Sequence, residues 1–136
     1  MQLNDKNLIK NKCYVDGKWV EASSGESFSV TNPATGSVIS TVPNFGADET
    51  RAAIQAAENA YSAWRAKTAK ERAVLLRNWF ELIIASADDL AALMTAEQGK
   101  PLAEARAEII YGASFVEWFS EEAKRIYGDT IPSPAN

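Results

Sequence analysis

The hydrophobic pattern changes its period once along the chain, and this change limits the folds that the two parts can form. Before Asp48 apolar and polar residues alternate over short runs, which is typical of β-strands, and after Asp48 apolar residues recur at nearly every fourth position, which is typical of helices. We therefore expect two short β-hairpin units within residues 12–43, followed by about four α-helices within residues 44–136. Residues 1–11 are polar and are expected to form a mobile arm.

Turn-forming residues locate the two hairpins. Asp16 and Gly17 stand between apolar flanks, and this pair suits a type I′ turn because both central residues need positive φ. The pattern predicts one hairpin over residues 13–20 and a second over residues 28–42, with its turn at residues 32–36. Four strands of this length are too few to make a self-sufficient sheet.

Capping signals divide the helical part. Thr68, with Glu71 three residues later, forms the pattern of a capping box, so a helix is expected to start at Ala69. Ser86 offers a second cap, which predicts a break between two helices near that residue. Gly99 stands where a helix end favours a left-handed residue.

The first and the last helix are expected to differ in their surfaces. The first is predicted over residues 48–64, and small residues along one of its faces would let another element approach closely there. The last is predicted to run from Pro101 to Tyr127, with Gly128 as its terminator and residues 129–136 extended. The small residues on the first helix are Ala52, Ala56, Ala60 and Ala63, and a face of this kind allows, but does not require, the close approach of another element.

Two helical stretches are apolar on more than one side, namely residues 74–84 and 109–119. A helix of this kind is usually buried on more than one side, whereas the short strands and small-residue helices cover little surface. We infer that other protein, either a further part of the chain or a partner, covers part of this surface. Trp64, Trp79 and Trp118 lie among apolar neighbours and are expected to pack in the core.

The charge and the cysteine content exclude several classes of function. The net charge is −4, and the basic residues are scattered, so nucleic acid and anionic membrane surfaces are poor partners. No apolar run approaches the length of a membrane span. The single cysteine allows no internal disulfide, and we expect the reducing environment of the cytoplasm.

The chain offers little catalytic chemistry of its own. It has no histidine, and none of its seven glycines lie two residues apart, so no glycine-rich phosphate-binding turn is present. Cys13 falls in a predicted strand and is interpreted as a structural thiol rather than a nucleophile. Glu104 and Glu108 share a helix face and are interpreted as solvated rather than as an acid–base pair. Asp88 and Asp89 are interpreted as acidic residues that favour a helix start.

Several runs resemble motifs of the aldehyde dehydrogenase family. They read VTNPATG at residues 30–36, EQGKP at residues 97–101 and YGDTIP at residues 127–132. Within that family, residues 46–54 and 113–119 are most similar to the bacterial NAD(P)-dependent succinate-semialdehyde dehydrogenases. The likeness covers nearly the whole chain, and the order and spacing of the motifs make it specific.

The resemblance implies an α/β parent fold with a Rossmann-like cofactor domain, a catalytic domain and a small oligomerisation sheet. It implies NAD or NADP as cofactor and the oxidation of succinate semialdehyde to succinate, a step of γ-aminobutyrate degradation. It further implies a homo-oligomer and a small aldehyde substrate. The family's catalytic and cofactor-binding residues follow the last matched motif, so we expect none of them in this chain. We therefore expect a truncated segment that is inactive alone and has the remainder of the enzyme as its partner.

The resemblance also implies roles for three residues. Tyr111 matches a helix position that lines the aldehyde entrance in some relatives, although the residues alone leave open whether it is a core or a pocket residue. The backbone carbonyl of Thr31 and the side chain of Glu97 match positions that hold a structural monovalent cation in some members. The alternatives to an enzyme segment are a non-catalytic helical interaction module, which docks a partner through its apolar faces, and a free-standing domain of another role.

Overall fold

The computed structural model describes residues 1–134. Over this range two antiparallel hairpins are followed by four helices, which confirms the expected order of elements. The elements are η1 (Lys6–Leu8), β1 (Cys13–Val15), β2 (Lys18–Val20), β3 (Ser27–Thr31), β4 (Val38–Pro43), α1 (Ala47–Arg65), α2 (Ala69–Ala85), α3 (Ala87–Gln98) and α4 (Leu102–Glu122).

Each hairpin forms its own two-stranded sheet. In the first, β1 pairs with β2, and Asp16 and Gly17 have φ values of 50° and 74°, which confirms the positive φ expected at both turn residues. Tyr14 and Trp19 lie opposite each other in this hairpin, with ring centroids 5.2 Å apart. In the second, β3 pairs with β4. The hairpins therefore follow from local turn chemistry and cross-strand pairs.

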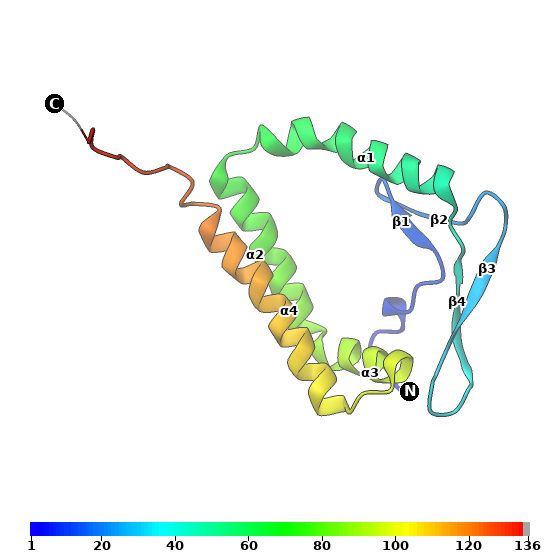
Figure 1. Ribbon diagram of the computed structural model, residues 1–136. Helices are drawn as coiled ribbons and strands as arrows, with labels where there is room; N and C mark the ends of the chain where they lie inside the picture. The colour runs from blue at the N-terminus through cyan, green and yellow to red at the C-terminus, as the bar shows by residue number, and fades with distance from the viewer. Residues whose placement is uncertain (135–136) are drawn as a thin grey trace.

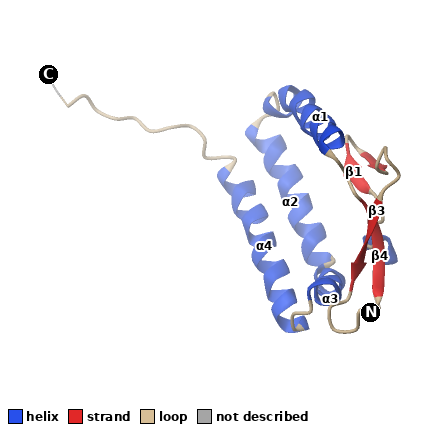
Figure 2. Cartoon of the chain, turned by 45° about the vertical axis from the view of Figure 1, so that its right-hand side comes forward, coloured by secondary structure: helices blue, strands red, loops and turns tan. Residues whose placement is uncertain are grey.

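The pair formed by α2 and α4 lies on one side of the molecule and the hairpins lie on the other, with α1 and α3 between them. Figure 1 shows α2 and α4 side by side and antiparallel. In the same view α3 lies across the lower end of this pair, and the hairpins lie to the right of it. The turned view of Figure 2 shows the same arrangement, with α1 joining the hairpins to the far end of α2. The closest helix packing is between α2 and α4 and between α3 and α4. The segment after α4 runs away from the body of the molecule (Figure 1).

Small residues form the buried core. Ala91 and Ala105 are fully buried, and Ala113 and Ser120 are 1% exposed, so α4 packs on its neighbours through small side chains. The alanine face of α1 would allow another element to approach closely, but within residues 1–134 no residue of α1 is buried. The other core residues are Leu3, Ala22, Ala73, Ala87 and Ala96.

The large apolar side chains lie outside this core. Trp64, Trp79 and Trp118 are 39%, 56% and 61% exposed, so the expectation that they pack in the core is wrong. The buried residues of α2 and α4 are small, namely Ala73, Ala105, Ala113 and Ser120, so Trp79 and Trp118 lie outside the packed contact within residues 1–134. Trp64 lies on α1, which has no buried residue. The uncovered apolar surface inferred from the two-sided pattern of these helices is thereby confirmed.

The helix boundaries agree with the capping signals except at the last end. Thr68 and Glu71 form the capping box of α2, and Gly99 has a φ of 84° at the end of α3, as expected. However, α4 ends at Glu122 and not at Tyr127. Tyr127 is 83% exposed, so no packing stabilises further turns of helix. Residues 129–134 carry no helix or strand, as expected, and residues 135–136 lie outside the described range.

The arm at the amino terminus contacts the helical part. Leu3 is 8% exposed, and residues Lys6–Leu8 form a short 3₁₀ turn. The backbone of Asn4 and Asp5 donates hydrogen bonds to Asp89 at the start of α3. The structure thus places the arm against α3, and its mobility in solution stays a prediction.

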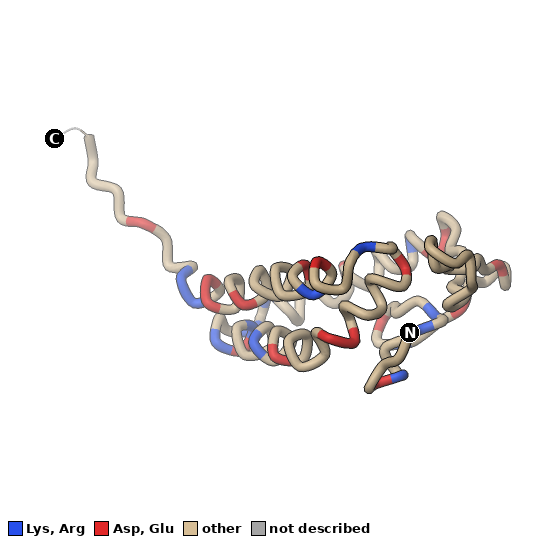
Figure 3. Tube along the Cα trace, turned by 90° about the horizontal axis from the view of Figure 1, so that it is seen from below, with Lys and Arg blue, Asp and Glu red and all other residues tan. Residues whose placement is uncertain are grey.

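Charged residues of both signs are interspersed along the chain. Figure 3 shows them alternating on the helices without a block of one sign. Four of the eight ion pairs found among residues 1–134 join side chains three or four residues apart, and exposed pairs of this kind contribute little to stability. Across residues 1–134, none of the helices combines the length and hydrophobicity that a membrane span would need.

Candidate functional site

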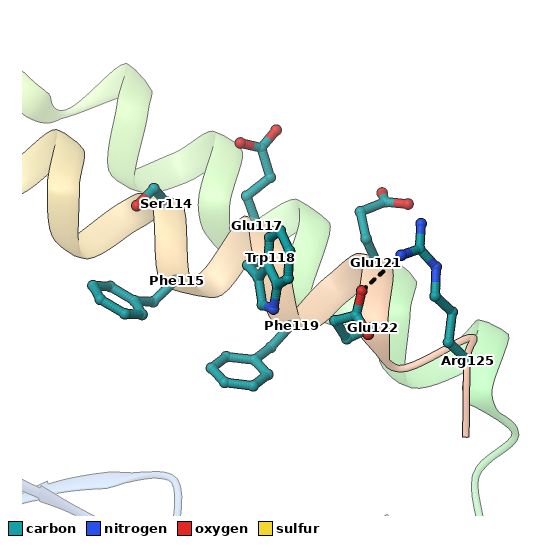
Figure 4. Close-up of a pocket in the computed structure, with 8 residues that line it drawn as sticks. All are labelled: Ser114, Phe115, Glu117, Trp118, Phe119, Glu121, Glu122 and Arg125. Carbon is teal, nitrogen blue, oxygen red and sulfur yellow. Dashed lines mark hydrogen bonds and ion pairs between the residues drawn. The ribbon is translucent and has the colours of Figure 1, made fainter. Parts of the chain in front are cut away.

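The candidate site is a row of aromatic side chains on α4, which we call the aromatic face: Tyr111, Phe115, Trp118 and Phe119. Their spacing of three and four residues places them on one side of the helix. Figure 4 shows Phe115 and Phe119 projecting from the same side of α4, with Glu117 on the opposite side. A groove runs along this helix, and its lining residues are Ser114, Phe115, Glu117, Trp118, Phe119, Glu121, Glu122 and Arg125.

Tyr111 extends the aromatic face toward the start of α4. Its ring meets that of Phe115 edge-on, with centroids 4.9 Å apart and an angle of 81° between the planes. Edge-to-face contact is a favoured geometry for aromatic pairs. Tyr111 is 64% exposed, so it is a surface residue of this chain and not a core residue. Its role at an aldehyde entrance stays a prediction.

An arginine on α2 forms an ion pair with α4 on the side opposite Phe115 and Phe119. The Arg77 guanidinium lies 3.1 Å from the Glu81 carboxylate on its own helix and 2.9 Å from the Glu117 carboxylate on α4. These two carboxylates, Glu81 first, raise the pKa of Arg77. The same guanidinium lies 5.0 Å from the centre of the Phe80 ring. The sequence analysis did not identify Arg77, because the Glu117 contact spans 40 residues.

Thr31 and Glu97 lie on two elements that meet at one junction. The turn after Thr31 packs on the end of α3, where Pro33 lies so close to Gly99 that an added Cβ would be 2.9 Å from the proline Cγ. In the described part of the chain, no hydrogen bond or ion pair involves the Glu97 side chain. Residues 1–134 contain no group of three His, Cys, Asp or Glu side chains that could hold a metal ion. The cation assignment stays a prediction.

The same junction contains an unsatisfied polar atom. The Thr95 hydroxyl is buried and has no hydrogen-bond partner among the described residues. It belongs to a residue that lines a cavity with Asn32, Gly99 and Met1. Oxygen atoms are the ligands that hard cations prefer, so the Thr31 carbonyl and Glu97 carboxylate suit such an ion.

The remaining candidates have structural partners. Cys13 is half-buried in β1, in agreement with its interpretation as a structural thiol. Glu108 pairs with Lys100. Asp88 lies in the first turn of α3 and pairs with Arg106 at 2.7 Å. These carboxylates therefore take part in ion pairs, and the chain holds no histidine that could pair with the thiol.

Comparison with known proteins identifies the larger group to which this arrangement belongs. The aldehyde dehydrogenase family matches residues 19–136. The chain is 64% identical to the glutarate-semialdehyde dehydrogenase of Pseudomonas putida and 63% identical to the succinate-semialdehyde dehydrogenase (NADP(+)) of Escherichia coli. Each alignment covers 97% of this chain, but only 28% and 27% of the respective relative.

The solved structures agree with the sequence matches. The crystal structure of an aldehyde dehydrogenase from Brucella melitensis biovar abortus superposes with a TM-score of 0.95 at 60% identity. The superposition covers the whole of this chain and 28% of that one. The hairpins, the four helices and their arrangement are thus those of a segment of such an enzyme. This chain belongs to the aldehyde dehydrogenase family.

Proposed function

We propose that this chain is the N-terminal portion of an NAD(P)-dependent semialdehyde dehydrogenase that oxidises succinate semialdehyde to succinate. The observation that carries this proposal is the identity of 64% and 63% to relatives named glutarate- and succinate-semialdehyde dehydrogenases over 97% of the chain. Both named substrates combine an aldehyde with a distal carboxylate. We further propose a cytoplasmic location, in keeping with the single cysteine of the chain, and a homo-oligomer, which rests on the family resemblance alone.

The chemistry of the whole enzyme requires groups beyond those found here. The nicotinamide cofactor, when bound, accepts hydride from the substrate, and the family resemblance assigns the nucleophile and the general base to later parts of the sequence. In this chain the only thiol is half-buried in a strand, and no histidine can activate it. The chain alone is therefore inactive in our proposal.

The role of this segment is then to support and to border the site. The aromatic face and the exposed apolar residues of α2 form a surface that the remainder of the enzyme covers, because exposed apolar areas of this kind mark interfaces. Tyr111, at one end of the aromatic face, borders the aldehyde entrance. The Thr31 carbonyl and the Glu97 carboxylate hold a structural monovalent cation, with the unsatisfied Thr95 hydroxyl at the same junction.

A chimeric enzyme tests this proposal. Residues 1–136 would replace the corresponding segment of the E. coli relative, and turnover of succinate semialdehyde with NADP would be measured for the chimera and for the chain alone. We expect activity in the chimera and none in the chain. Activity of the chain alone, or a folded chimera without activity, would contradict the proposal.

The role of Tyr111 is tested in the same chimera. Replacing Tyr111→Ala removes the ring that borders the proposed entrance, so we expect a higher KM for the aldehyde and little change in kcat. Tyr14→Ala is the matched control, because that ring lies in the first hairpin and contacts Trp19. Equal kinetic parameters for Tyr111→Ala and the unmodified chimera would remove Tyr111 from the entrance.

The alternative function is a non-catalytic interaction module, and the exposed aromatic face favours it to the same degree as the enzyme segment. The two functions differ in what must cover this surface. An enzyme segment needs the remainder of the dehydrogenase, whereas an interaction module binds a separate protein. An active chimera favours the enzyme segment, because the chain then completes a dehydrogenase without another partner.

A further inference from the structure

The first residues of the chain are held at one point on α3. Asp89, the third residue of that helix, is 8% exposed, and both of its carboxylate oxygens accept hydrogen bonds from the arm. Oδ1 accepts from the Asn4 backbone amide at 3.0 Å and from the Asn4 side-chain amide at 3.1 Å. Oδ2 accepts from the Asp5 backbone amide at 2.8 Å.

Comparison with Asp88 shows that Asp89 does more than place a negative charge at the start of α3. Asp88 also lies in the first turn of α3, but its side chain is 77% exposed and pairs with Arg106 on α4. The Asp89 carboxylate instead receives charge-assisted hydrogen bonds from residues more than 80 positions away. The backbone amides of Asn4 and Asp5 lower the pKa of Asp89, which keeps it ionised and accepting.

The arm runs along α3 in the opposite direction to the helix. Met1 lines a cavity together with Thr95 and Gly99 near the end of α3, whereas Asn4 lies at its start. Three residue steps of extended chain span about 10 Å. Six helical steps from Asp89 to Thr95 rise about 9 Å. The two lengths match, so residues 1–4 can span about half of the 12-residue helix.

The arm is also ordered after its contact with Asp89. The Asp5 side chain accepts a hydrogen bond from the Asn7 amide at 2.9 Å and caps the 3₁₀ turn of Lys6–Leu8. Leu3, between the two anchoring regions, is buried. The segment thus has a polar anchor, an apolar contact and a defined turn.

We propose that residues 1–8 form a strap, which the Asp89 carboxylate anchors on α3 and which covers the cavity beside the Thr95 hydroxyl. The three hydrogen bonds that join the strap to α3 all end on the Asp89 carboxylate, so the strap can be released without breaking a backbone hydrogen bond of α3. Its release would open the junction between the second hairpin and α3 to water. This role is independent of the aldehyde that the whole enzyme oxidises.

The test compares Asp89→Asn with Asp88→Asn in the full chain. Both variants remove one negative charge from the first turn of α3, but only the first weakens the anchor. Because a hydrogen bond to a charged group is stronger than one to a neutral amide, amide exchange at Asn4 and Asp5 should be at least about tenfold faster in Asp89→Asn. Trypsin should also cleave after Lys6 faster in that variant than in Asp88→Asn. Equal exchange and equal cleavage in the two variants would overturn the proposal.

A second variant acts from the other side of the contact. Asp5→Pro removes the amide that donates to Asp89 Oδ2 and leaves α3 unchanged, so it also decides the case if Asp89→Asn unfolds the helix. We expect faster exchange at Asn4 and unchanged exchange in α4. Unchanged exchange at Asn4 would mean that the anchor does not hold the strap.

Discussion

Gly99 is the residue at which two motifs of the sequence meet. Its φ of 84° ends α3, and the ring of Pro33 occupies the space where a Cβ would lie. The backbone conformation favours glycine because a side chain in the left-handed region is strained. The contact with Pro33 adds a second requirement, which joins the VTNPATG turn to the EQGKP helix end.

Replacing Gly99→Ala is therefore expected to destabilise the chain twice over. Strain in the left-handed region costs of order 1–3 kcal/mol, and the contact with Pro33 adds to it. Gly36→Ala is the matched control, because Gly36 has a φ of 71° and open space around it. Urea unfolding followed by circular dichroism should show the larger loss for Gly99→Ala. If both variants lost the same free energy of unfolding, Pro33 would be able to move away from the added methyl group without destabilising the chain.

Glu49 is a second residue whose surroundings decide its chemistry. Its carboxylate accepts hydrogen bonds from the Ser23 hydroxyl and the Ser23 amide, and from the Gly46 amide at 3.0 Å. These hydrogen bonds, the Ser23 hydroxyl first, lower its pKa from 4.5 to about 2. Because the pKa is lower in the folded chain, this carboxylate stabilises the fold above about pH 4.5, and the contribution is lost as the pH falls toward 2.

Replacing Ser23→Ala should raise the pKa of Glu49 part of the way back to 4.5, since the amide hydrogen bonds remain. A titration of the side-chain carboxyl carbon by NMR measures this directly. Ser24→Ala is the control, because the Ser24 hydroxyl accepts from the Glu26 amide and does not contact Glu49. A Glu49 pKa that moves equally in both variants would refute the assignment to Ser23.

Among the described helices, α2 has the most completely capped N-terminus. The Thr68 hydroxyl accepts a hydrogen bond from the Glu71 amide, and the Glu71 carboxylate accepts one from the Thr68 amide at 2.7 Å. This reciprocal pair satisfies two of the amides that a helix start leaves open. It fixes where α2 begins, and α2 in turn supports α4 through Arg77 and the small residues between the two helices.

The capping box gives a prediction at this scale. Thr68→Ala should lower the free energy of unfolding by about 0.5–2 kcal/mol. Ser114→Ala is the control, because that hydroxyl donates to the Tyr111 carbonyl inside α4 and its loss leaves no helix start uncapped. Chemical unfolding of both variants measures the difference. If both substitutions lowered the free energy of unfolding equally, the capping hydrogen bond would contribute no more than an ordinary hydroxyl hydrogen bond inside a helix.

The whole molecule is open, since its helices pack through small side chains and leave large ones uncovered. Phe115, Phe119 and Trp118 are each about half exposed or more. Exposed apolar side chains that gather on one helix face mark an interaction surface. An alignment that spans only 28% of a relative is consistent with such a surface, because the rest of the relative is available to cover it.

The exposed surface should bind hydrophobic dyes. We expect strong fluorescence of 8-anilinonaphthalene-1-sulfonate with the chain, and a clear reduction in Trp118→Asn because the aromatic face loses its largest ring. Trp64→Asn is the control, since Trp64 lies on α1, away from the aromatic face. An equal reduction in both variants would mean that the dye does not bind at α4.

Much of the local structure could be predicted from the sequence. The Asp16-Gly17 turn, the Thr68 cap and the Gly99 helix end were all predicted at the residues where they occur. Each depends on hydrogen bonds or φ values within a few residues, so the sequence around it is sufficient. The uncovered apolar sides of α2 and α4 could also be predicted, because the hydrophobic pattern of each helix depends only on its own residues.

The tertiary structure alone decided which distant residues meet. The sequence predicts an acidic first turn for α3, but the partner of Asp89 is Asn4, 85 residues earlier, and no local pattern indicates it. The same holds for Arg77 with Glu117, and for Trp118, whose exposure depends on what lies against α4. Local hydrogen bonds and dihedral preferences determine where each element begins and ends, whereas burial and long-range contacts depend on how the elements assemble in space.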